Sequence, residues 1–292
     1  MDHKELMRGV RLLEIKTRRL VDGALTGHYH AAFKGRGMQL AEVREYSIGD
    51  EVRDIDWSVT ARTGKPHVKV WEEERELTMM LLIDVSASAA HCGTSASTLR
   101  ERCAEIAATL ALSALRGGDK VGLVLFTDKV ELYIPAARGR GHILRLIREM
   151  LSFEPTGRQT DLRAPLEFIM RVMKKRCIAF LLSDFISPHD YTAPLNAVAA
   201  RHDLVAIRCS DTLADTLPNV GLVNYTDAET GSHITIDTSS PQTRARYRAL
   251  AEKRREEVRT LFAARPARYM ETDTRSDFVM PLMALLETGT QR

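Results

Sequence analysis

Five oxygen-bearing side chains stand at positions where a folded chain could gather them around a metal ion. The first three form an Asp-x-Ser-x-Ser pattern, Asp84-Val85-Ser86-Ala87-Ser88, directly after a short apolar run. Two further residues fall in the same class of position, Thr160 in a loop before a predicted helix and Asp184 at the end of another apolar run. In an open α/β sheet, ligands bind beyond the carboxyl ends of the strands, at the point where the strand order reverses.

The chemistry of this set is coordination by hard oxygen ligands. Two carboxylates and three hydroxyls suit Mg²⁺ or Mn²⁺ and offer no soft ligand for zinc or copper. Neutral hydroxyls leave such an ion short of negative charge, so it attracts an Asp or Glu side chain from a partner. The alternative is that these residues only cap the segments that follow them, as Ser and Asp commonly do. The pattern predicts a metal site at Asp84, Ser86, Ser88, Thr160 and Asp184.

The elements that must position these residues alternate along the chain. Short runs that are apolar almost throughout are typical of parallel strands covered on both faces by helices; they are Met79–Ile83, Val121–Phe126, Ile178–Leu182 and Leu204–Ile207. Segments with helical spacing lie between them, at about 98–115, 143–151, 162–174 and 193–201. The alternation predicts an α/β fold with a doubly wound, mostly parallel, Rossmann-like sheet.

The two ends of the chain differ from this pattern. After residue 207 we expect a β-hairpin excursion near 218–239, a charged helix at 241–264, a strand at 268–271 and a helix at 277–286. The first 75 residues predict a small N-terminal α+β region with a helix near 5–20, so the expected division is 1–75 and 76–292. Paired charges around Arg53–Trp57 are expected to hold the small region to the large domain, with Trp57 and Trp71 as anchors in that junction; the alternative is a binding surface at Arg53–Trp57.

Composition limits the class of protein. The 292 residues are 44% hydrophobic and 28% charged, and the formal net charge of +3 does not by itself imply a nucleic-acid or membrane partner. No apolar run approaches the ~20 residues of a membrane helix, and the first twenty residues lack a signal-peptide pattern. The four cysteines have no paired spacing, so we expect a reducing, cytoplasmic location.

Enzymatic signatures are not found in the sequence, and we expect no catalytic activity. Gly64-Lys65 is followed by Pro66 instead of Ser or Thr, so no P-loop is present. No Ser, Cys or Thr stands in a glycine-flanked elbow with an assignable base. The arginine-rich helix at 244–259 leaves nucleic-acid binding as the alternative function, although glutamates at helical pairing distances make a solvated helix face the simpler interpretation and nucleic acid an unlikely partner.

The five candidate metal ligands match in order the metal-ion-dependent adhesion site of the von Willebrand factor A fold, which the predicted large domain resembles. Nearly the whole chain is similar to the family called domain of unknown function 58, on the motifs Gly35-Arg36-Gly37-Met38, Gly49-Asp50-Glu51-Val52-Arg53-Asp54-Ile55-Asp56-Trp57, Gly118-Asp119-Lys120-Val121-Gly122-Leu123 and Ser183-Asp184-Phe185. Members of that family typically accompany MoxR-type AAA+ ATPases. The resemblance therefore implies a non-enzymatic partner or adaptor of such an ATPase, in protein remodelling or metal insertion.

Overall fold

The computed structural model describes residues 13, 17, 26–33, 38–73, 77–90, 98–211, 216–226, 229 and 231–287. The chain divides into two compact units, one made of Met1–Ala32 with Thr78–Arg292 and the other of Phe33–Leu77. The second segment of the large unit begins at Thr78, close to the boundary expected at 75/76. The first 32 residues, which were expected to belong to the small N-terminal region, group with the large unit. The helix expected near 5–20 lies outside the described residues, apart from Leu13 and Thr17.

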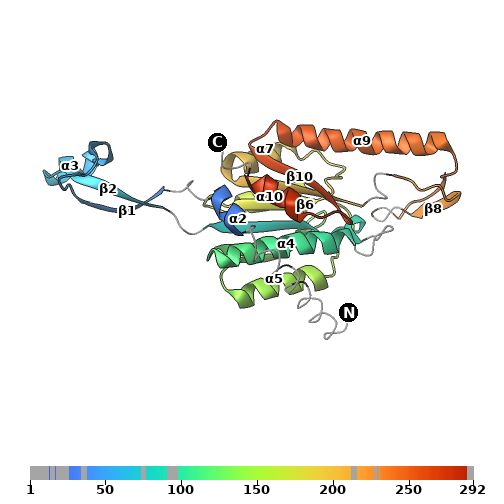
Figure 1. The fold of residues 1–292 in the computed structure, drawn as a ribbon, viewed down its shortest axis with the longest axis horizontal. Coiled ribbons are helices and arrows are strands. Elements are labelled where there is room, and N and C mark those ends of the chain that lie inside the picture. The colour runs from blue at the N-terminus through green and yellow to red at the C-terminus, as the bar shows by residue number, and fades with distance from the viewer. Residues whose placement is uncertain are drawn as a thin grey trace. The chain divides into compact units, whose positions relative to one another are not determined.

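A six-stranded sheet forms the centre of the large unit (Figure 1). Its strands, in spatial order, are β10 (Ala267–Asp273), β7 (Asp203–Ser210), β6 (Ile178–Ser183), β3 (Thr78–Asp84), β4 (Lys120–Phe126) and β5 (Val130–Ala137). All neighbours pair in parallel except β4 and β5. After β3 the chain adds β4 and β5 on one side of it, and then returns to add β6, β7 and β10 on the other side. This arrangement confirms the predicted doubly wound, mostly parallel sheet. The order reverses between β3 and β6.

The strands form where the sequence is apolar on both faces, because helices cover both sides of the sheet. Every residue of β6 and all but the first of β3 and β4 are buried. Figure 1 shows α4 (Leu99–Arg116) and α5 (Arg140–Ser152) on one side, with α7 (Thr192–Arg201) and α9 (Pro241–Ala263) on the other. The elements α2, α6 and α10 complete the unit, at Thr26–Phe33, Arg163–Val172 and Val279–Glu287.

The helix that follows the Asp-x-Ser-x-Ser segment begins where its capping residues require. The Thr98 hydroxyl accepts a hydrogen bond from the Glu101 backbone N–H at 3.0 Å, and the Glu101 carboxylate accepts one from the Thr98 N–H at 2.8 Å. This reciprocal pair satisfies two amides that the first helical turn leaves open. Helix α4 ends before Gly117 and Gly118, and Gly118 adopts a φ of 75°, which glycine tolerates at a helix end.

One strand of the sheet was not expected from the sequence. Strand β5 follows β4 after a three-residue connection and pairs with it antiparallel, with register irregularities. Most of its side chains are only partly buried, and Pro135 lies within it, which an edge strand tolerates because one side of its backbone has no neighbour. A partly exposed strand with a proline lacks the continuous apolar run by which the other strands were predicted.

The predicted hairpin is present outside the main sheet. Strands β8 (Leu222–Thr226) and β9 (His233–Asp237) pair only with one another, antiparallel, and most of their side chains are exposed. The base of the hairpin is closed by Thr238, whose N–H and hydroxyl both donate to the Gly221 carbonyl, at 2.8 and 2.6 Å. Helix α9 then begins after Ser240, which caps it, with Pro241 as its first residue, as predicted.

The small unit contains the antiparallel strands β1 (Met38–Glu45) and β2 (His67–Glu73), a 3₁₀ turn η2 (Val52–Asp54) and the helix α3 (Trp57–Thr63). Asp56 caps α3 by accepting from the Ser58 and Val59 amides. The side chain of Trp57 is 67% exposed, and the expectation that it anchors the small unit to the large one stays a prediction. The side chain of Trp71 lies outside the described part of the structure.

Candidate metal site

The two aspartates of the predicted site lie at the carboxyl ends of neighbouring strands. Asp84 is the last residue of β3, and Asp184 follows β6 directly. Strands β3 and β6 pair in parallel, so both carboxylates stand at the same edge of the sheet, at the point where the strand order reverses. This is the crevice in which open α/β sheets bind ligands, as the sequence predicted.

The Asp-x-Ser-x-Ser loop is folded by its own side chains. One oxygen of Asp84 accepts from the Ser86 backbone N–H at 2.9 Å, and the other accepts from the Ser183 hydroxyl at 2.7 Å. The hydroxyls of Ser86 and Ser88 lie 3.0 Å apart. Asp84 is 2% exposed, and burial raises the pKa of its carboxyl, against the hydrogen bonds from Ser183 and Ser86. Three of the predicted ligands are therefore brought together on one turn.

Thr160 reaches this turn from a separate loop and is completely buried. The Ala87 N–H donates to the Arg158 carbonyl at 3.0 Å, which ties the two loops together through the backbone. The Thr160 hydroxyl donates to Glu229 Oε1 at 2.9 Å. On the Asp184 side, the Ser187 hydroxyl lies 3.5 Å from the Thr160 carbonyl, so the three loops expected to converge do so.

The Thr160 loop is supported by Glu131, a residue that no sequence pattern had indicated. A carboxylate oxygen of Glu131, on β5, accepts from the Gly157 N–H at 2.6 Å and from the Thr127 hydroxyl at 2.9 Å. These donors hold the pKa of Glu131 below its ordinary value, against the effect of burial. Gly157 packs so closely that an added Cβ would lie 2.2 Å from the side chains of Thr127 and Asp128, so only glycine fits there.

Asp184 is partly accessible and lies beside a negative charge. Burial, followed by the charge of Asp84, raises the pKa of the Asp184 carboxyl to about 7, while a hydrogen bond from the Ile186 N–H at 2.9 Å opposes the shift. The next residue, Phe185, is a non-glycine residue with a φ of 61°, a backbone conformation that costs on the order of 1–2 kcal/mol. The buried Phe185 ring packs edge-on against Phe262 with centroids 5.1 Å apart, which holds the strained turn in place.

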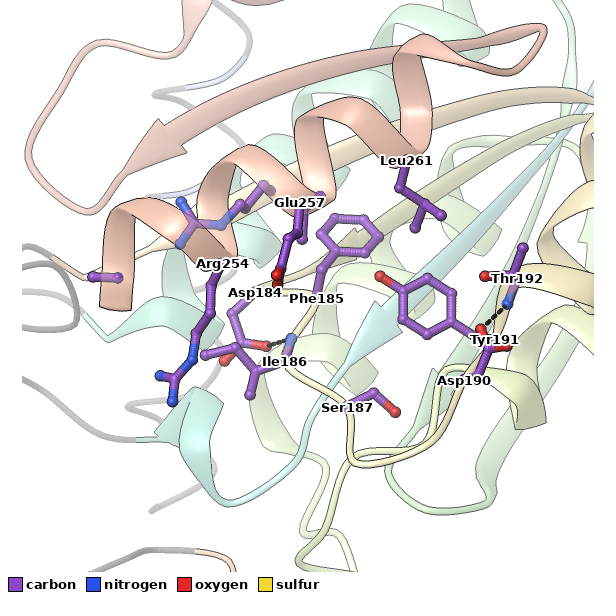
Figure 2. Close-up of a pocket in the computed structure, with 13 residues that line it drawn as sticks. Asp184, Phe185, Ile186, Ser187, Asp190, Tyr191, Thr192, Arg254, Glu257 and Leu261 are labelled. Atoms are coloured by element: carbon purple, nitrogen blue, oxygen red, sulfur yellow. Dashed lines mark hydrogen bonds between the residues drawn. The ribbon is translucent and has the colours of Figure 1, made fainter. Parts of the chain in front are cut away.

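A pocket of about 310 Å³ opens beside Asp184, between the loop after β6 and helix α9. Figure 2 shows Asp184 at its wall, with Arg254 and Glu257 of α9 nearby and with Tyr191 and Leu261 forming an apolar part. A side chain that reached Asp184 through this pocket would thus meet both apolar surface and charge.

The donor set fits a hard divalent cation. Burial raises the pKa of both the Asp84 and Asp184 carboxyls, and the charge of Asp84 raises that of Asp184 further; a bound cation would stabilise the ionised carboxylates. Among the described residues, no group of three or more His, Cys, Asp or Glu side chains is arranged to hold a metal, so any ion here must rely on the hydroxyls as well. That composition suits Mg²⁺ or Mn²⁺ and not zinc.

The alternative interpretation, that these residues only cap the segments that follow them, explains fewer of the observed contacts. Helix α4 is capped by Thr98, well after the Asp-x-Ser-x-Ser turn. The Ser86 and Ser88 hydroxyls contact one another, and Asp184 accepts from an amide in a turn and not from the first turn of a helix. Two residues at the site were missed by sequence reasoning, Ser183 and Glu229; Ser183 stands at the end of a strand and in the motif Ser183-Asp184-Phe185, but it was not selected as a site residue.

Solved structures with a similar course of the chain include a conserved hypothetical protein, BatB, from Bacteroides thetaiotaomicron, which is 12% identical with a TM-score of 0.49 and covers 74% of this chain and 100% of that one. A von Willebrand factor type A protein from Catenulispora acidiphila is 12% identical with a TM-score of 0.44 and covers 75% of this chain and 44% of its own.

Relatives in sequence come from mycobacteria. The uncharacterized protein Rv1480 of Mycobacterium tuberculosis (strain ATCC 25618 / H37Rv) is 34% identical over 233 residues, which is 79% of this chain and 73% of that protein. The uncharacterized protein MAV169 of Mycobacterium avium is 36% identical over 108 residues, which is 36% of this chain and 64% of that protein. The family model described as protein of unknown function DUF58 matches residues 42–257, and the chain belongs to this family.

Proposed function

We propose that this protein is a non-enzymatic binding module whose divalent-metal site captures an acidic side chain of a protein partner. The observation that carries the proposal is the pair of aspartates at the carboxyl ends of the neighbouring parallel strands β3 and β6, near the buried hydroxyls of Ser86 and Thr160. The ligands would be Asp84, Ser86, Ser88, Thr160 and Asp184, some of them through water. When bound, Mg²⁺ or Mn²⁺ supplies an electropositive centre with an open position for an oxygen ligand.

The residues around the site support binding and not turnover. Hydrogen bonds from Ser183 and from the Ser86 amide orient the Asp84 carboxylate. The Asp184 carboxylate is fixed by the Ile186 amide. A partner carboxylate that completed the coordination would gain a charge-assisted contact in a crevice that is partly shielded from water, where such contacts are stronger than in bulk solvent.

The identity of the partner rests on the family resemblance. We propose a MoxR-type AAA+ ATPase, or a client of such an ATPase, that presents an Asp or Glu side chain to the metal. A pull-down of the ATPase is expected to succeed with Mg²⁺, to fail reversibly with EDTA, and to fail with Asp184→Ala. Binding that persists with EDTA and with Asp184→Ala would place the interface elsewhere, and the exposed surface of the small unit would be the next region to test.

Helix α9 does not favour nucleic acid as the ligand. Within the helix, Arg259 pairs with Glu256 at 3.6 Å and Lys253 with Glu257 at 3.9 Å, as is typical of a solvated helix face. Arg255 pairs with Glu271 of β10 at 2.5 Å. A gel shift that is absent, or that does not weaken as salt is raised, would exclude phosphate-directed binding.

Metal binding is tested by titrating Mn²⁺ into the wild type and into Asp84→Ala in a calorimeter. We expect the substitution to weaken affinity by more than about 100-fold, because even residues that only orient a metal ligand change affinity by about 10- to 100-fold. Circular dichroism with EDTA should show that the fold survives, since the large unit buries its own apolar core. Equal affinity in the two proteins would refute the proposal.

A further inference from the structure

The pocket beside Asp184 shares one turn of the chain with the candidate metal site. The Ile186 N–H donates to the Asp184 carboxylate at 2.9 Å, while the Ile186 side chain, 46% exposed, lines the pocket. The two residues are two positions apart, and consecutive Cα atoms lie about 3.8 Å from one another. Exposed apolar surface therefore begins within about two residues of a candidate metal ligand (Figure 2).

The rest of the apolar wall is already in place without a ligand. Phe185 and Tyr191 are buried, and Figure 2 shows the Leu261 side chain of α9 directed toward their rings. The loop that carries Tyr191 is fixed by Asp190, whose carboxylate accepts from the Thr192 N–H at 2.9 Å. A wall that is formed in advance costs less free energy to occupy than one that must be ordered on binding.

The volume of the pocket limits what it can hold. At about 310 Å³ it lies at the lower end of the range of about 300–1,000 Å³ for ligand pockets. It is suited to one large apolar side chain, such as Leu or Phe, whose burial would remove the exposed part of Ile186 from water. Because the pocket and Asp184 lie on the same turn, one short segment of a partner can supply both this side chain and the acidic one.

Arg254 adds a positive charge at the same place. It is exposed on α9 and lies at the edge of the pocket, near Asp184 in Figure 2. Glu257, the other charged side chain of α9 at the pocket, lies 3.9 Å from Lys253, whereas no ion pair of Arg254 is found among the described residues. An exposed cation at the rim of an interface attracts and orients an acidic segment.

We propose that the pocket beside Asp184 binds a large apolar side chain of the partner, next in sequence to the acidic residue on the metal, and that Arg254 contacts a further acidic side chain of the same segment. The inference rests on the proposed function and specifies the partner as a short segment in which Leu or Phe stands beside Asp or Glu. The metal contact alone would accept any accessible carboxylate, so the pocket supplies the selectivity of the site.

Three peptides with capped ends test this preference on the full-length protein. Gly-Leu-Asp-Leu-Gly presents Leu beside Asp in either chain direction, Gly-Ala-Asp-Ala-Gly lacks the large apolar side chains, and Gly-Leu-Asn-Leu-Gly lacks the carboxylate. Dissociation constants are measured with Mg²⁺ from amide chemical shifts of the isotope-labelled protein, which detect weak binding. We expect the Leu peptide to bind the wild type at least about tenfold more tightly than the Ala peptide, because a Leu side chain leaves water.

Ile186→Ser tests the pocket itself. Leu250→Ser is the matched control, because Leu250 is 47% exposed on α9 and does not belong to the pocket lining. A substitution that disturbed the metal would weaken both Asp peptides by the same factor, so the ratio of their dissociation constants reports the pocket alone. We expect this ratio to fall by at least about threefold in Ile186→Ser and to keep its wild-type value in Leu250→Ser.

A fourth peptide, Glu-Leu-Asp-Leu-Glu, tests Arg254. It should bind the wild type about two- to fivefold more tightly than Gly-Leu-Asp-Leu-Gly, the range for an exposed ion pair, and the gain should shrink as salt is raised. Arg254→Gln should abolish the gain, while Arg248→Gln, which removes another exposed cation from α9, should keep it. A gain that is the same in Arg254→Gln and the wild type would overturn the role of Arg254.

The peptides also separate this inference from the proposed function. If the Asp peptide binds more tightly than the Asn peptide, but Leu and Ala peptides bind equally or their ratio is unchanged in Ile186→Ser, the apolar pocket is overturned and the metal site stands. If the Asp and Asn peptides do not differ on the wild type, or if EDTA leaves binding of the Asp peptide unchanged, the proposed function is overturned and this inference with it.

Discussion

The metal edge of the large unit and the surface of the small unit break the usual rule of burial in opposite ways. At the metal edge, polar side chains are buried: Asp84 is 2% exposed, and Ser86 and Thr160 are 0% exposed. In the small unit, apolar side chains are exposed: Ile48, Val52 and Trp57 are 103%, 64% and 67% exposed. Buried polar groups cost free energy unless they are hydrogen-bonded, and a contiguous exposed apolar surface is uncommon on a monomer.

The difference indicates that the two regions are suited to different kinds of contact with other molecules. The large unit supplies oriented charge on a rigid sheet edge, where hydrogen bonds fix each carboxylate before a ligand arrives. The small unit presents apolar surface beside internal ion pairs such as Arg44–Asp50 at 2.7 Å and Lys65–Glu45 at 3.0 Å. Substitutions should therefore separate stability, metal affinity and surface contacts from one another.

The largest effect is expected from the core beneath the metal edge. Phe262 is fully buried, stacked on Tyr269 with ring centroids 5.2 Å apart, and it packs against Phe185, which follows Asp184. Phe262→Ala should lower the free energy of unfolding by about 3–5 kcal/mol, because it removes a buried ring and leaves a cavity. Urea denaturation measures this; a loss below about 1 kcal/mol would show that this part of the core is not packed as described.

The next effect concerns a residue that orients a ligand without being one. Ser183→Ala removes the hydrogen bond to Asp84 Oδ2 and the acceptor of the Phe185 N–H, with little change in volume. We expect Mn²⁺ affinity to fall by about 10-fold or more, the range for residues that support a metal ligand, and the free energy of unfolding to fall by about 1–3 kcal/mol, because the buried Phe185 N–H loses its acceptor. Calorimetry measures the affinity. If the affinity is unchanged, the orientation of Asp84 does not depend on Ser183.

The pH dependence follows from the raised pKa of Asp184, about 7 in the fold against an ordinary 3.8. Without metal, the folded protein holds a proton between about pH 4 and pH 7 that the unfolded chain has lost, so this group stabilises the fold fully below about pH 4 and its contribution is lost as pH rises through 7. Metal binding needs the ionised carboxylate, so Mn²⁺ affinity should fall below pH 7 by at most about tenfold per unit.

The control for this prediction is the variant Asp184→Asn, whose side-chain amide does not titrate. The difference in unfolding free energy between wild type and variant, measured by urea denaturation with EDTA, should change between pH 4 and pH 7 in the stated direction. A difference that is constant over this range would contradict the raised pKa.

The smallest effect is expected in the small unit. Trp57→Ala should change the free energy of unfolding by no more than about 0.5 kcal/mol, since the side chain is 67% exposed, and should leave Mn²⁺ affinity unchanged. Thermal denaturation and calorimetry check both. A large loss of stability would mean that Trp57 is packed after all, as its sequence context had indicated.

The sequence predicted the parts of this molecule whose signals are local. Apolar runs identified β3 and β6, and the Asp-x-Ser-x-Ser spacing together with Thr160 and Asp184 identified three loops that meet at one edge of the sheet. What it missed depends on contacts distant in sequence. Glu229 reaches Thr160 across 69 positions, and no spacing rule connects them. Strand β5 was missed because it is half exposed and contains Pro135.

The small unit shows what a local pattern leaves open. The charged residues around Trp57 predicted ion pairs that hold the small unit to the large one, with Trp57 as an anchor, and this stays a prediction. Within the small unit, Asp56 caps the helix that begins at Trp57, and the indole is 67% exposed. The role of Asp56 depends on where the helix begins, which composition does not determine.

We propose that a divalent cation binds between the carboxyl ends of β3 and β6, and anomalous diffraction from crystals grown with Mn²⁺ would locate it. We expect one strong anomalous peak within coordination distance, about 2.0–2.3 Å, of oxygens from Asp84, Ser86 or Ser88, with Thr160 and Asp184 bound directly or through water. No peak there at saturating Mn²⁺, or peaks only elsewhere on the protein, would contradict it.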